Sequence, residues 1–189
     1  DMHTEGITKI TPTDIKYAQA MGRAIKLLAT SKKGPKGYTA IVAPFLLPAS
    51  HPLYAVNGVF NAIFVHGNVL GDAMFYGSGA GKLPTASAVV ADVVDCAKNK
   101  GRNIMMSWSE EKLDLLQIDD VKSRFFVRVS GHAAERQSEI EELFGKAEIV
   151  AVPSLSEEFA FITGEITEQE YREKAEKLDG IQSRIRARI

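Results

Sequence analysis

Residues 75–92 read FYGSGAGKLPTASAVVAD, and the organisation of the surrounding chain depends on this stretch. An apolar run leads into three glycines within five residues, and Pro84 then precedes apolar residues at helical spacing. The pattern predicts a strand, a glycine turn and a helix. Because glycine has no Cβ, a ligand can approach the backbone N–H groups at such a helix start. Two interpretations of the turn are compatible with the sequence: it binds an anionic or carboxamide group, or it is a tight turn without a ligand.

Three familiar glycine motifs do not fit the stretch. A P-loop requires glycine where Tyr76 stands and Ser or Thr where Leu83 stands. A dinucleotide fingerprint that starts at Gly77 requires glycine in place of Lys82. A nucleophile elbow around Ser78 also requires glycine at position 76, so Ser78 is not predicted to be a nucleophile.

The segment before the glycine turn predicts a β-hairpin. Residues 60–66 and 69–76 have strand composition and flank Gly67 and Asn68, which are typical of a two-residue hairpin turn. The second strand therefore leads directly into the glycine turn.

Further upstream, residues 11–14 (TPTD) have the signature of a helix start, with threonine as cap and proline at the first helical position. The helix is expected to bury Ile15, Ala18 and Met21. Strands are predicted at 24–29 and 38–46, and Pro44 indicates an edge strand or a bulge.

Composition and charge narrow the function classes. The chain is 45% hydrophobic and 25% charged with a net charge of −1, so it can bury a core, and nothing favours nucleic acid or a membrane surface as a partner. No apolar run is long enough to cross a bilayer. The four histidines are too scattered to predict a metal site. The single cysteine, Cys96, is expected to be a buried thiol, and its isolation is consistent with a reducing, cytoplasmic compartment.

Several motifs follow one another in the order and spacing of bacterial homoserine dehydrogenases. They are EGI at 5–7, DI at 14–15, IKLL at 25–28, Pro44 with LLP at 46–48, HPL at 51–53, NA at 61–62, YGSGAG at 76–81, PTASAV at 84–89 and Asp92. Residues 5–98 therefore resemble this family, and the motifs are specific in combination.

The resemblance implies an enzyme that interconverts L-aspartate 4-semialdehyde and L-homoserine with NADPH or NADH, on the route to threonine, methionine and isoleucine. It also implies that the glycine turn contacts the cofactor near its nicotinamide end, with Gly81 the first candidate and Gly79, Ala80 and Thr85 the next. The family's catalytic lysine, paired acids and nucleotide-binding domain would precede this chain. We therefore predict no catalytic residue here and an inactive fragment. Family members dimerise through this region, so a homodimer or higher homo-oligomer is expected.

The tail predicts a second organisation. Strands are expected at 123–129, 147–153, 158–163 and 181–189, with helices at 138–144 and 167–178. This β-α-β-β-α-β order is that of a ferredoxin-like fold. It resembles the regulatory ACT domain of many homoserine dehydrogenases, which pairs and can bind an effector such as threonine.

The predicted fold class is therefore α+β, with a mixed or antiparallel sheet that carries helices on one face, followed by the ACT-like domain. The expected ranges are a partial catalytic and dimerisation domain at 1–100, a connector at 101–121 with a short helix at 109–116, and the ACT-like domain at 122–189.

Two features of the tail bear on binding. The family's first loop carries Asp and then Gly, whereas residues 131–135 read GHAAE, which argues against a threonine effector. Arg184, Arg186 and Arg188 alternate along the last strand and are predicted to form a solvated face rather than a polyanion site.

Three hypotheses follow: part of an enzyme, an amino-acid-binding module, or a structural unit that assembles subunits. A glycine fingerprint and a catalytic lysine upstream would favour the first hypothesis. An exposed apolar sheet face would favour the third.

Overall fold

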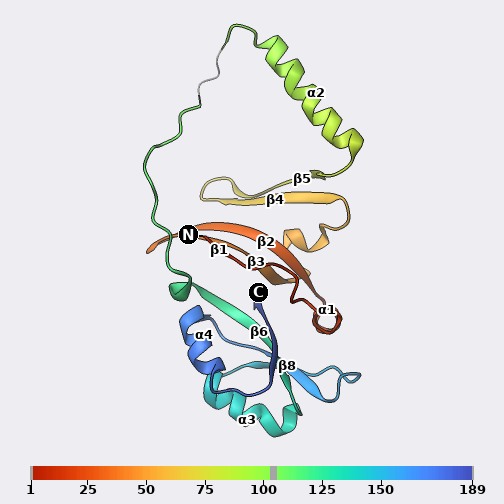
Figure 1. The fold of residues 1–189 in the computed structure, drawn as a ribbon, viewed down its shortest axis with the longest axis vertical. Helices are drawn as coiled ribbons and strands as arrows, with labels where there is room; N and C mark the ends of the chain where they lie inside the picture. The colour runs from red at the N-terminus through yellow and green to blue at the C-terminus, as the bar shows by residue number, and fades with distance from the viewer. Residues whose placement is uncertain (1, 103–105, 189) are drawn as a thin grey trace. The chain divides into compact units, whose positions relative to one another are not determined.

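A computed structural model describes residues 2–102 and 106–188. The chain divides into two compact units, which Figure 1 shows in sequence colours. Unit 1 contains residues 1–54 and 113–189, and unit 2 contains residues 55–112.

Unit 1 joins segments that the sequence assigned to different domains. The strands before residue 49 share one sheet with those of the tail. The two units therefore divide the chain differently from the predicted ranges 1–100, 101–121 and 122–189. Those ranges stay a prediction about domain organisation.

The sheet of unit 1 has eight strands among the described residues. Its order is β1-β3-β10-β6-β8-β7, with β2 paired to β3 and β9 paired to β6. Both β1 and β10 run parallel to β3, and the other pairs are antiparallel, so of the two predicted alternatives, mixed or antiparallel, the sheet is mixed. The strands are β1 (His3–Thr4), β2 (Arg23–Gly34), β3 (Gly37–Pro48), β6 (Lys122–Ser130), β7 (Glu148–Val150), β8 (Glu158–Ile162), β9 (Ile166–Thr167) and β10 (Ile181–Ala187).

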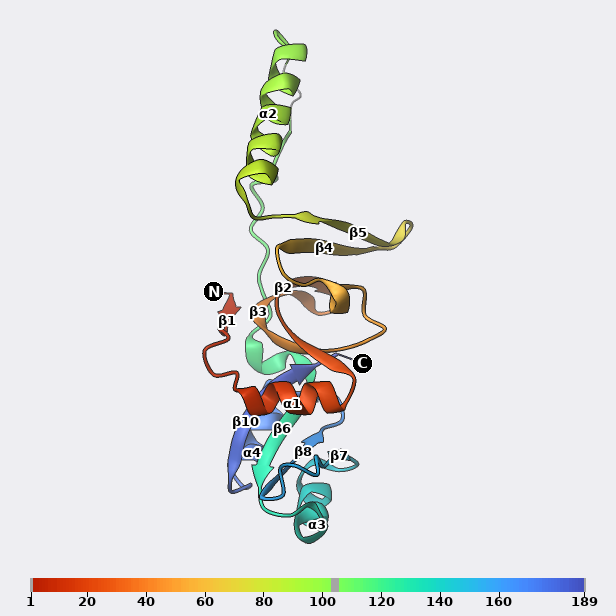
Figure 2. The same ribbon diagram turned by 90° about the vertical axis from the view of Figure 1, so that its right-hand side faces the viewer.

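Helices cover both faces of this sheet. The helix α1 (Pro12–Ala20) packs against one face, where Tyr17 meets Phe126 of β6 in a buried cluster (Figure 2). On the other face lie α3 (Ala133–Phe144) and α4 (Glu168–Ala175). Helices were predicted on one face of the N-terminal sheet only. The strand β10 joins the N-terminal strands to those of the tail in one sheet, so the helices of the tail cover its second face.

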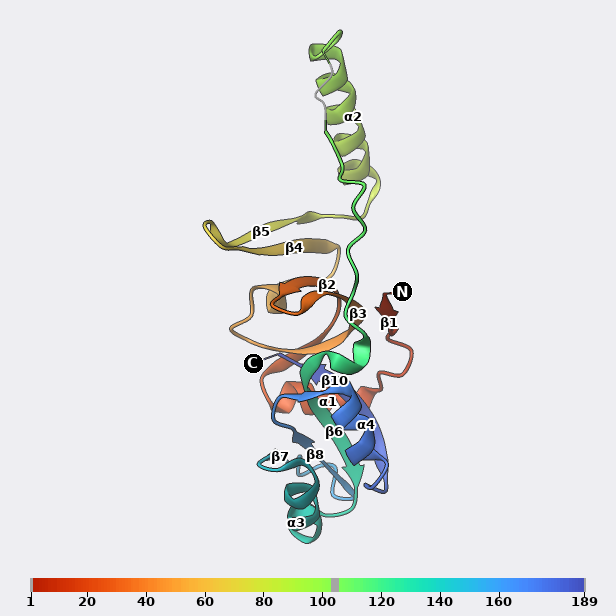
Figure 3. The ribbon, with the colours of Figure 1, turned by 90° about the vertical axis from the view of Figure 1, so that its left-hand side faces the viewer.

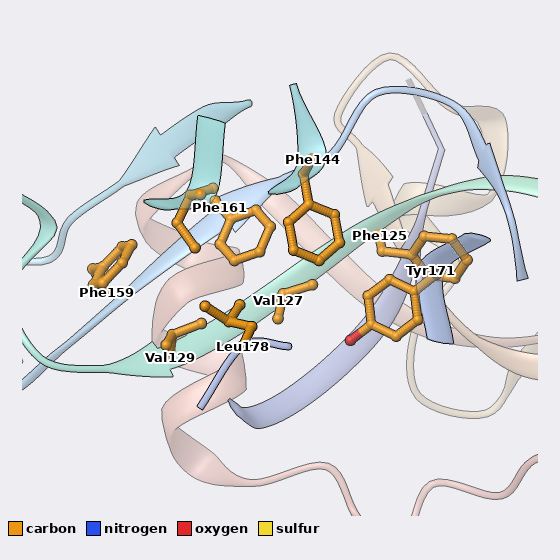
Figure 4. Packing of buried hydrophobic residues seen from close by; sticks show 9 residues of the cluster. Phe125, Val127, Val129, Phe144, Phe159, Phe161, Tyr171 and Leu178 are labelled. Carbon is orange, nitrogen blue, oxygen red and sulfur yellow. The ribbon is translucent and has the colours of Figure 1, made fainter. Parts of the chain in front are cut away.

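The larger core of unit 1 lies between β6, β8 and the helices α3 and α4 (Figure 4). Phe125 and Tyr171 have ring centroids 4.4 Å apart, and Phe144 and Phe161 have theirs 5.1 Å apart. Both faces of β6 are buried, so this strand is a nearly continuous apolar run interrupted by Arg128.

A register shift in β10 decides which side chains face which helix. It lies between Ile181 and Ser183, where an extra residue reverses the alternation of side chains. Ile181 therefore packs with the core of α3 and α4, whereas Ser183 bonds to Asp14 of α1. The side chains of Arg184 and Arg186 then point to the face of the sheet that α4 covers, where both contact Glu168.

The start of α1 is confirmed, but its buried face differs from the prediction. Thr11 caps the helix and forms a reciprocal capping box with Asp14. The buried residues are Asp14, Tyr17 and Ala18, while Ile15 is 46% exposed. Asp14 also pairs with the buried Arg128, so the side of the helix that carries Asp14 faces the sheet. Ile15, the next residue, therefore faces outward.

Pro44 marks neither an edge nor a bulge. It lies opposite Leu27 in an unbroken register between β2 and β3. On the other side of β3, residues 41–42 pair with β1 and residues 45–46 pair with β10. Pro44 therefore falls in the gap between two parallel partners, where a strand can accommodate a missing N–H.

Unit 2 contains the hairpin and the helix that the sequence predicted around the glycine turn (Figure 3). The strands β4 (Phe60–Gly67) and β5 (Gly71–Ser78) are antiparallel, and α2 spans Lys82–Lys98. The hairpin turn has three residues, 68–70, rather than two, because Gly67 pairs with Gly71.

The apolar face of α2 is exposed. No residue of this helix is buried, and Val89, Val90, Val93 and Val94 are 42–61% exposed. Cys96 is exposed as well, so the predicted buried thiol is wrong for this chain. Apolar spacing identifies the side of a helix that can be buried, but burial needs a second surface that covers it.

The predicted helix at 109–116 is also wrong. Residues 106–114 have no regular structure, and Leu116 donates its backbone N–H to the carbonyl oxygen of Tyr38 at 2.8 Å. Leu115 also forms an isolated β-bridge with Tyr38, so residues 115–116 lie extended beside the start of β3. Two short 3₁₀ helices, Pro52–Ala55 and Ile118–Asp120, complete the described elements, and no described helix is long and apolar enough to span a membrane.

Candidate functional site

The candidate site is the glycine turn, residues 79–81, which links β5 to α2. Gly81 is the N-cap of α2 and has φ 114° and ψ 153°, a combination that residues with a side chain rarely adopt. Its carbonyl oxygen accepts the N–H of Thr85 at 3.2 Å, which closes the first helical turn. No side chain caps the helix, so the backbone itself forms its N-terminal surface.

The predicted site residues lie together on this surface. Gly79, Ala80, Gly81 and Thr85 are all exposed, and the first turn of α2 contains no acidic residue. A helix of 17 residues has a positive N-terminal end, and its first N–H groups can donate to a carbonyl or anionic oxygen. The arrangement can therefore bind and orient a polar ligand through its backbone.

Gly79 and Gly81 have different surroundings. A Cβ at Gly81 would meet only the ring of Pro84, at 3.5 Å, which is an ordinary contact. A Cβ at Gly79 would lie 2.1 Å from Nδ2 of Asn61, so the Asn61 side chain already fills that space. This contact was not predicted from the sequence, although the hairpin pairing places Asn61 beside the end of β5.

The acidic side chains that follow the turn in unit 2 are exposed. Asp92 and Asp95 lie on the exposed surface of α2. His66 and Asp72 form an exposed pair with Nδ1 and Oδ1 2.5 Å apart, but they lie at the turn end of the hairpin, away from Ser78. No group of three potential metal ligands occurs among the residues that the structure describes.

The strongest electrostatic interactions belong to unit 1. Nε of Arg128 donates to Oδ1 of Asp14 at 2.8 Å, and its Nη1 donates to both carboxylate oxygens of Glu158 at 2.8 Å. Burial acts to raise the pKa of Asp14, but hydrogen bonds from Ser183 and Thr11 and the charge of Arg128 outweigh it. The pKa of Asp14 is therefore held below its usual value, and the carboxylate stays ionised.

A second charge cluster surrounds Arg186, which is 1% exposed. Its Nε donates to Oε1 of Glu168 at 2.5 Å and its Nη1 donates to Oε2 of Glu5 at 2.9 Å. Arg184 bridges the same two acids, with both contacts at 2.7 Å. The predicted solvated face is wrong for these two arginines, because acids distant in sequence neutralise them within the fold.

The pKa of Glu5 reflects this cluster. Burial favours the neutral acid, but hydrogen bonds from Arg186 and His3 and the charges of Arg184 and Arg186 favour the carboxylate. The net result is a pKa of about 2 for Glu5. In both clusters the charges are mutually satisfied by partners within unit 1.

Comparison with known proteins identifies the family. The family model for homoserine dehydrogenase matches residues 1–94, which include the glycine turn and most of α2. A homoserine dehydrogenase of Corynebacterium glutamicum is 53% identical over 105 residues, and that of Neisseria gonorrhoeae is 39% identical over 135 residues. The chain belongs to the homoserine dehydrogenase family.

Solved homoserine dehydrogenases share the fold of nearly the whole chain. The enzyme from Thiobacillus denitrificans has a TM-score of 0.78 and 28% identity over 97% of this chain. The S. aureus enzyme at pH 6.0 has a TM-score of 0.75 and 28% identity over the full chain. The structural likeness therefore extends into the tail, beyond the residues that the family model matches.

The chain is shorter than these homoserine dehydrogenases. It spans 24% and 31% of the two curated relatives and 47% and 48% of the two solved chains. The two curated matches cover 53% and 67% of this chain. The glycine turn lies in the part that sequence and structure both relate to the family.

Proposed function

We propose that the chain is the C-terminal part of a homoserine dehydrogenase that reduces L-aspartate 4-semialdehyde to L-homoserine with NADPH or NADH, on the route to threonine, methionine and isoleucine. The observation that carries the proposal is the family match over residues 1–94, which contains an exposed, ligand-accessible glycine turn. A cytoplasmic location, suggested by the lone cysteine, stays a prediction.

The residues of the turn fit a nicotinamide dinucleotide. The backbone at Gly81 is open to an incoming group, and the positive helix end suits a carboxamide oxygen or a phosphate. We propose that Gly81 makes the main cofactor contact, and that Ala80, Thr85 and Gly79 flank it. The cofactor, when bound, supplies the hydride. The turn would bind and orient it through backbone groups.

The proton donor for the reduction is proposed to lie outside this chain. An alkoxide that forms from an aldehyde needs a positioned acid, and the acids of α2, Asp92 and Asp95, lie on its exposed surface. We propose that a lysine and paired acids in preceding residues of the parent protein perform this step. The isolated chain is then expected to be inactive.

The test is homoserine oxidation, followed as the appearance of NADPH or NADH. The 189-residue chain is compared with a parent protein extended upstream, at equal concentrations. Activity in the longer protein alone supports the proposal. Activity in the short chain would place the catalytic groups within residues 1–189, and inactivity of the longer protein with both dinucleotides would refute the assigned reaction.

A second function is proposed for the tail, residues 122–189. The tail has the antiparallel strand order β10-β6-β8-β7, with α3 after β6 and α4 after β8, which agrees with the element order expected for a ferredoxin-like domain. This order supports the ACT-like assignment and a regulatory or oligomerisation role.

The first loop of the tail favours oligomerisation over threonine sensing. Arg136 folds back over the loop, where its Nη1 donates to the carbonyl oxygen of Ser130 at 2.9 Å and its Nε donates to Glu139 at 2.8 Å. The loop is thus already closed by a side chain of its own helix. We expect homoserine oxidation by the parent protein to be insensitive to threonine, and inhibition by threonine would contradict this expectation.

The exposed hairpin of unit 2 supports assembly. Ile63, Val65 and Phe75 lie on one face of the β4–β5 hairpin and are 44–69% exposed. We propose that this apolar face contributes to a homodimer or higher homo-oligomer, which sedimentation of the parent protein would test. A monomer at micromolar concentration would argue against it.

A further inference from the structure

Asn61 of β4 packs directly against Gly79 in the turn. A Cβ built on Gly79 would lie 2.1 Å from Nδ2, 2.8 Å from Cγ and 3.3 Å from Cβ of Asn61. The side chain of Asn61 therefore occupies the position that any residue other than glycine would need. Gly79 has no positive φ, so the Asn61 side chain is the obstacle that a larger residue at this position would have to displace.

A backbone contact ties the same two segments together. The N–H of Gly79 donates to the carbonyl oxygen of Val59 at 3.2 Å, one step beyond the pair of Phe60 with Ser78. Val59, just before β4, and Asn61 of β4 thus hold Gly79 from two directions, through a backbone hydrogen bond and through the Asn61 side chain. The next residues along the chain, Ala80 and the N-cap Gly81, lead into α2.

We propose that Asn61 is a positioning residue for the cofactor-binding turn. Its side chain packs over Gly79 and fixes the path of the chain from β5 into Gly81, so that the N–H groups at the start of α2 keep one direction. In this arrangement Gly79 is glycine to admit Asn61, and Gly81 is the glycine that faces the ligand. The inference rests on the proposed function, because the ligand is the dinucleotide assigned there.

The chain offers a matched control at Gly77. This residue pairs with Asn61 in the hairpin, yet a Cβ at Gly77 would have no heavy atom within 4 Å. Gly77→Ala adds the same methyl group two residues from Gly79 without touching Asn61. Gly77→Ala therefore shows whether any alanine in β5 impairs the protein, or only an alanine that displaces Asn61.

The experiment measures the KM for the dinucleotide, the KM for homoserine and kcat in the upstream-extended parent protein. The variants are Asn61→Ala, Gly79→Ala, the double variant and Gly77→Ala. We expect Asn61→Ala to raise the dinucleotide KM on the order of tenfold to a hundredfold, because a small displacement of a binding group has such effects. The homoserine KM should stay within about twofold, since homoserine does not contact this side chain in the proposal.

The double variant tests the contact itself. Gly79→Ala alone should raise the dinucleotide KM more than Asn61→Ala does, because the new methyl group collides with the Asn61 amide. Removing that amide leaves only its Cβ at 3.3 Å, so the double variant should recover part of the loss. Effects that simply add, or an unchanged KM in Asn61→Ala, would overturn the proposal.

Amide hydrogen exchange in the 189-residue chain gives a readout that does not depend on activity. Asn61→Ala should accelerate exchange at residues 79–85 and leave residues 122–130 unchanged, whereas Gly77→Ala should change neither. If the wild-type parent protein does not oxidise homoserine, the proposed function fails, and the exchange data still decide whether Asn61 holds the turn. Unchanged exchange at 79–85 would refute the positioning role.

Discussion

Arg128 and Asp14 form an ion pair in the interior of unit 1, although 114 positions separate them in the sequence. Their side chains are 6% and 0% exposed, and Nε lies 2.8 Å from Oδ1. The pair joins the first helix to the central strand of the tail. Each charge is out of water, so each depends for its solvation on the other and on the further partners Glu158 and Ser183.

Loss of Arg128 should therefore destabilise the chain strongly. Arg128→Met keeps most of the side-chain volume but leaves the Asp14 carboxylate buried without its cation. We expect a loss of roughly 3–5 kcal/mol in the free energy of unfolding, the usual range when one partner of a buried pair is removed. Urea unfolding followed by circular dichroism measures this change.

The control for that variant is an exposed ion pair in the same unit. Arg172 and Asp119 are in contact, with side chains 56% and 42% exposed. Arg172→Ala should cost less than about 1 kcal/mol, as surface pairs do. An equal loss of unfolding free energy in Arg128→Met and Arg172→Ala would mean that burial of the Arg128–Asp14 pair does not increase its contribution to stability.

The pH dependence of stability should reveal Glu5. Its pKa is about 2 in the folded chain against a usual value of 4.5. Above pH 4.5 the carboxylate is ionised in both states, and its full stabilising contribution is present. As the pH falls from about 4.5 to about 2 the unfolded chain binds a proton first, so the contribution is progressively lost.

Glu5→Gln isolates this effect. The variant should be less stable than the wild type above pH 4.5, and the difference should shrink as the pH falls toward 2. Asp14 is present in both proteins, so its own titration cancels in the comparison. A difference that stays constant from pH 6 to pH 2.5 would contradict the assigned pKa of Glu5.

Local sequence signals predicted most of the elements of this fold. The capping boxes at Thr11 and Thr167 predicted two helix starts, and the alternation of apolar residues predicted the strands of the tail. The glycine turn was predicted in the same way, since its strand, glycines and helix follow one another directly. Each of these signals depends on residues close together in the sequence, so the local structure that it predicts forms in the folded chain as well.

Contacts between distant segments could not be predicted from one sequence. Arg186 looked solvated because its acidic partners, Glu5 and Glu168, lie 181 and 18 positions away. The exposure of the α2 valines and the contact of Asn61 with Gly79 likewise depend on which surfaces meet. Hairpin register was the one signal that could have placed Asn61 near the turn.

The exposed thiol of Cys96 gives a test of what covers α2. In the 189-residue chain Cys96 should react with a disulfide reagent without denaturant, because its side chain is accessible to solvent. In the upstream-extended parent protein the reaction should slow if another surface covers the apolar face of the helix. Cys96→Ser, which removes the only cysteine, gives the background rate.

Either rate is informative. A thiol of the 189-residue chain that reacts only in urea would contradict the exposure of α2. Equal, rapid rates in the short chain and the parent protein would show that the helix face around Cys96 stays open in both.

Gly81→Ala should impair the turn more directly than any change in its side-chain neighbours. The backbone of Gly81 has φ 114° and ψ 153°, a region that costs a residue with a side chain about 1–3 kcal/mol. Alanine would relieve this strain by rotating the backbone, which turns the first N–H groups of α2 away from their present direction. We expect the dinucleotide KM of the parent protein to rise by roughly tenfold or more, the equivalent of that energy. The helix content should change little, because residues 85–98 keep their hydrogen bonds. An unchanged dinucleotide KM in a folded Gly81→Ala parent protein would show that the cofactor does not depend on this turn, and would leave α2 with a structural role only.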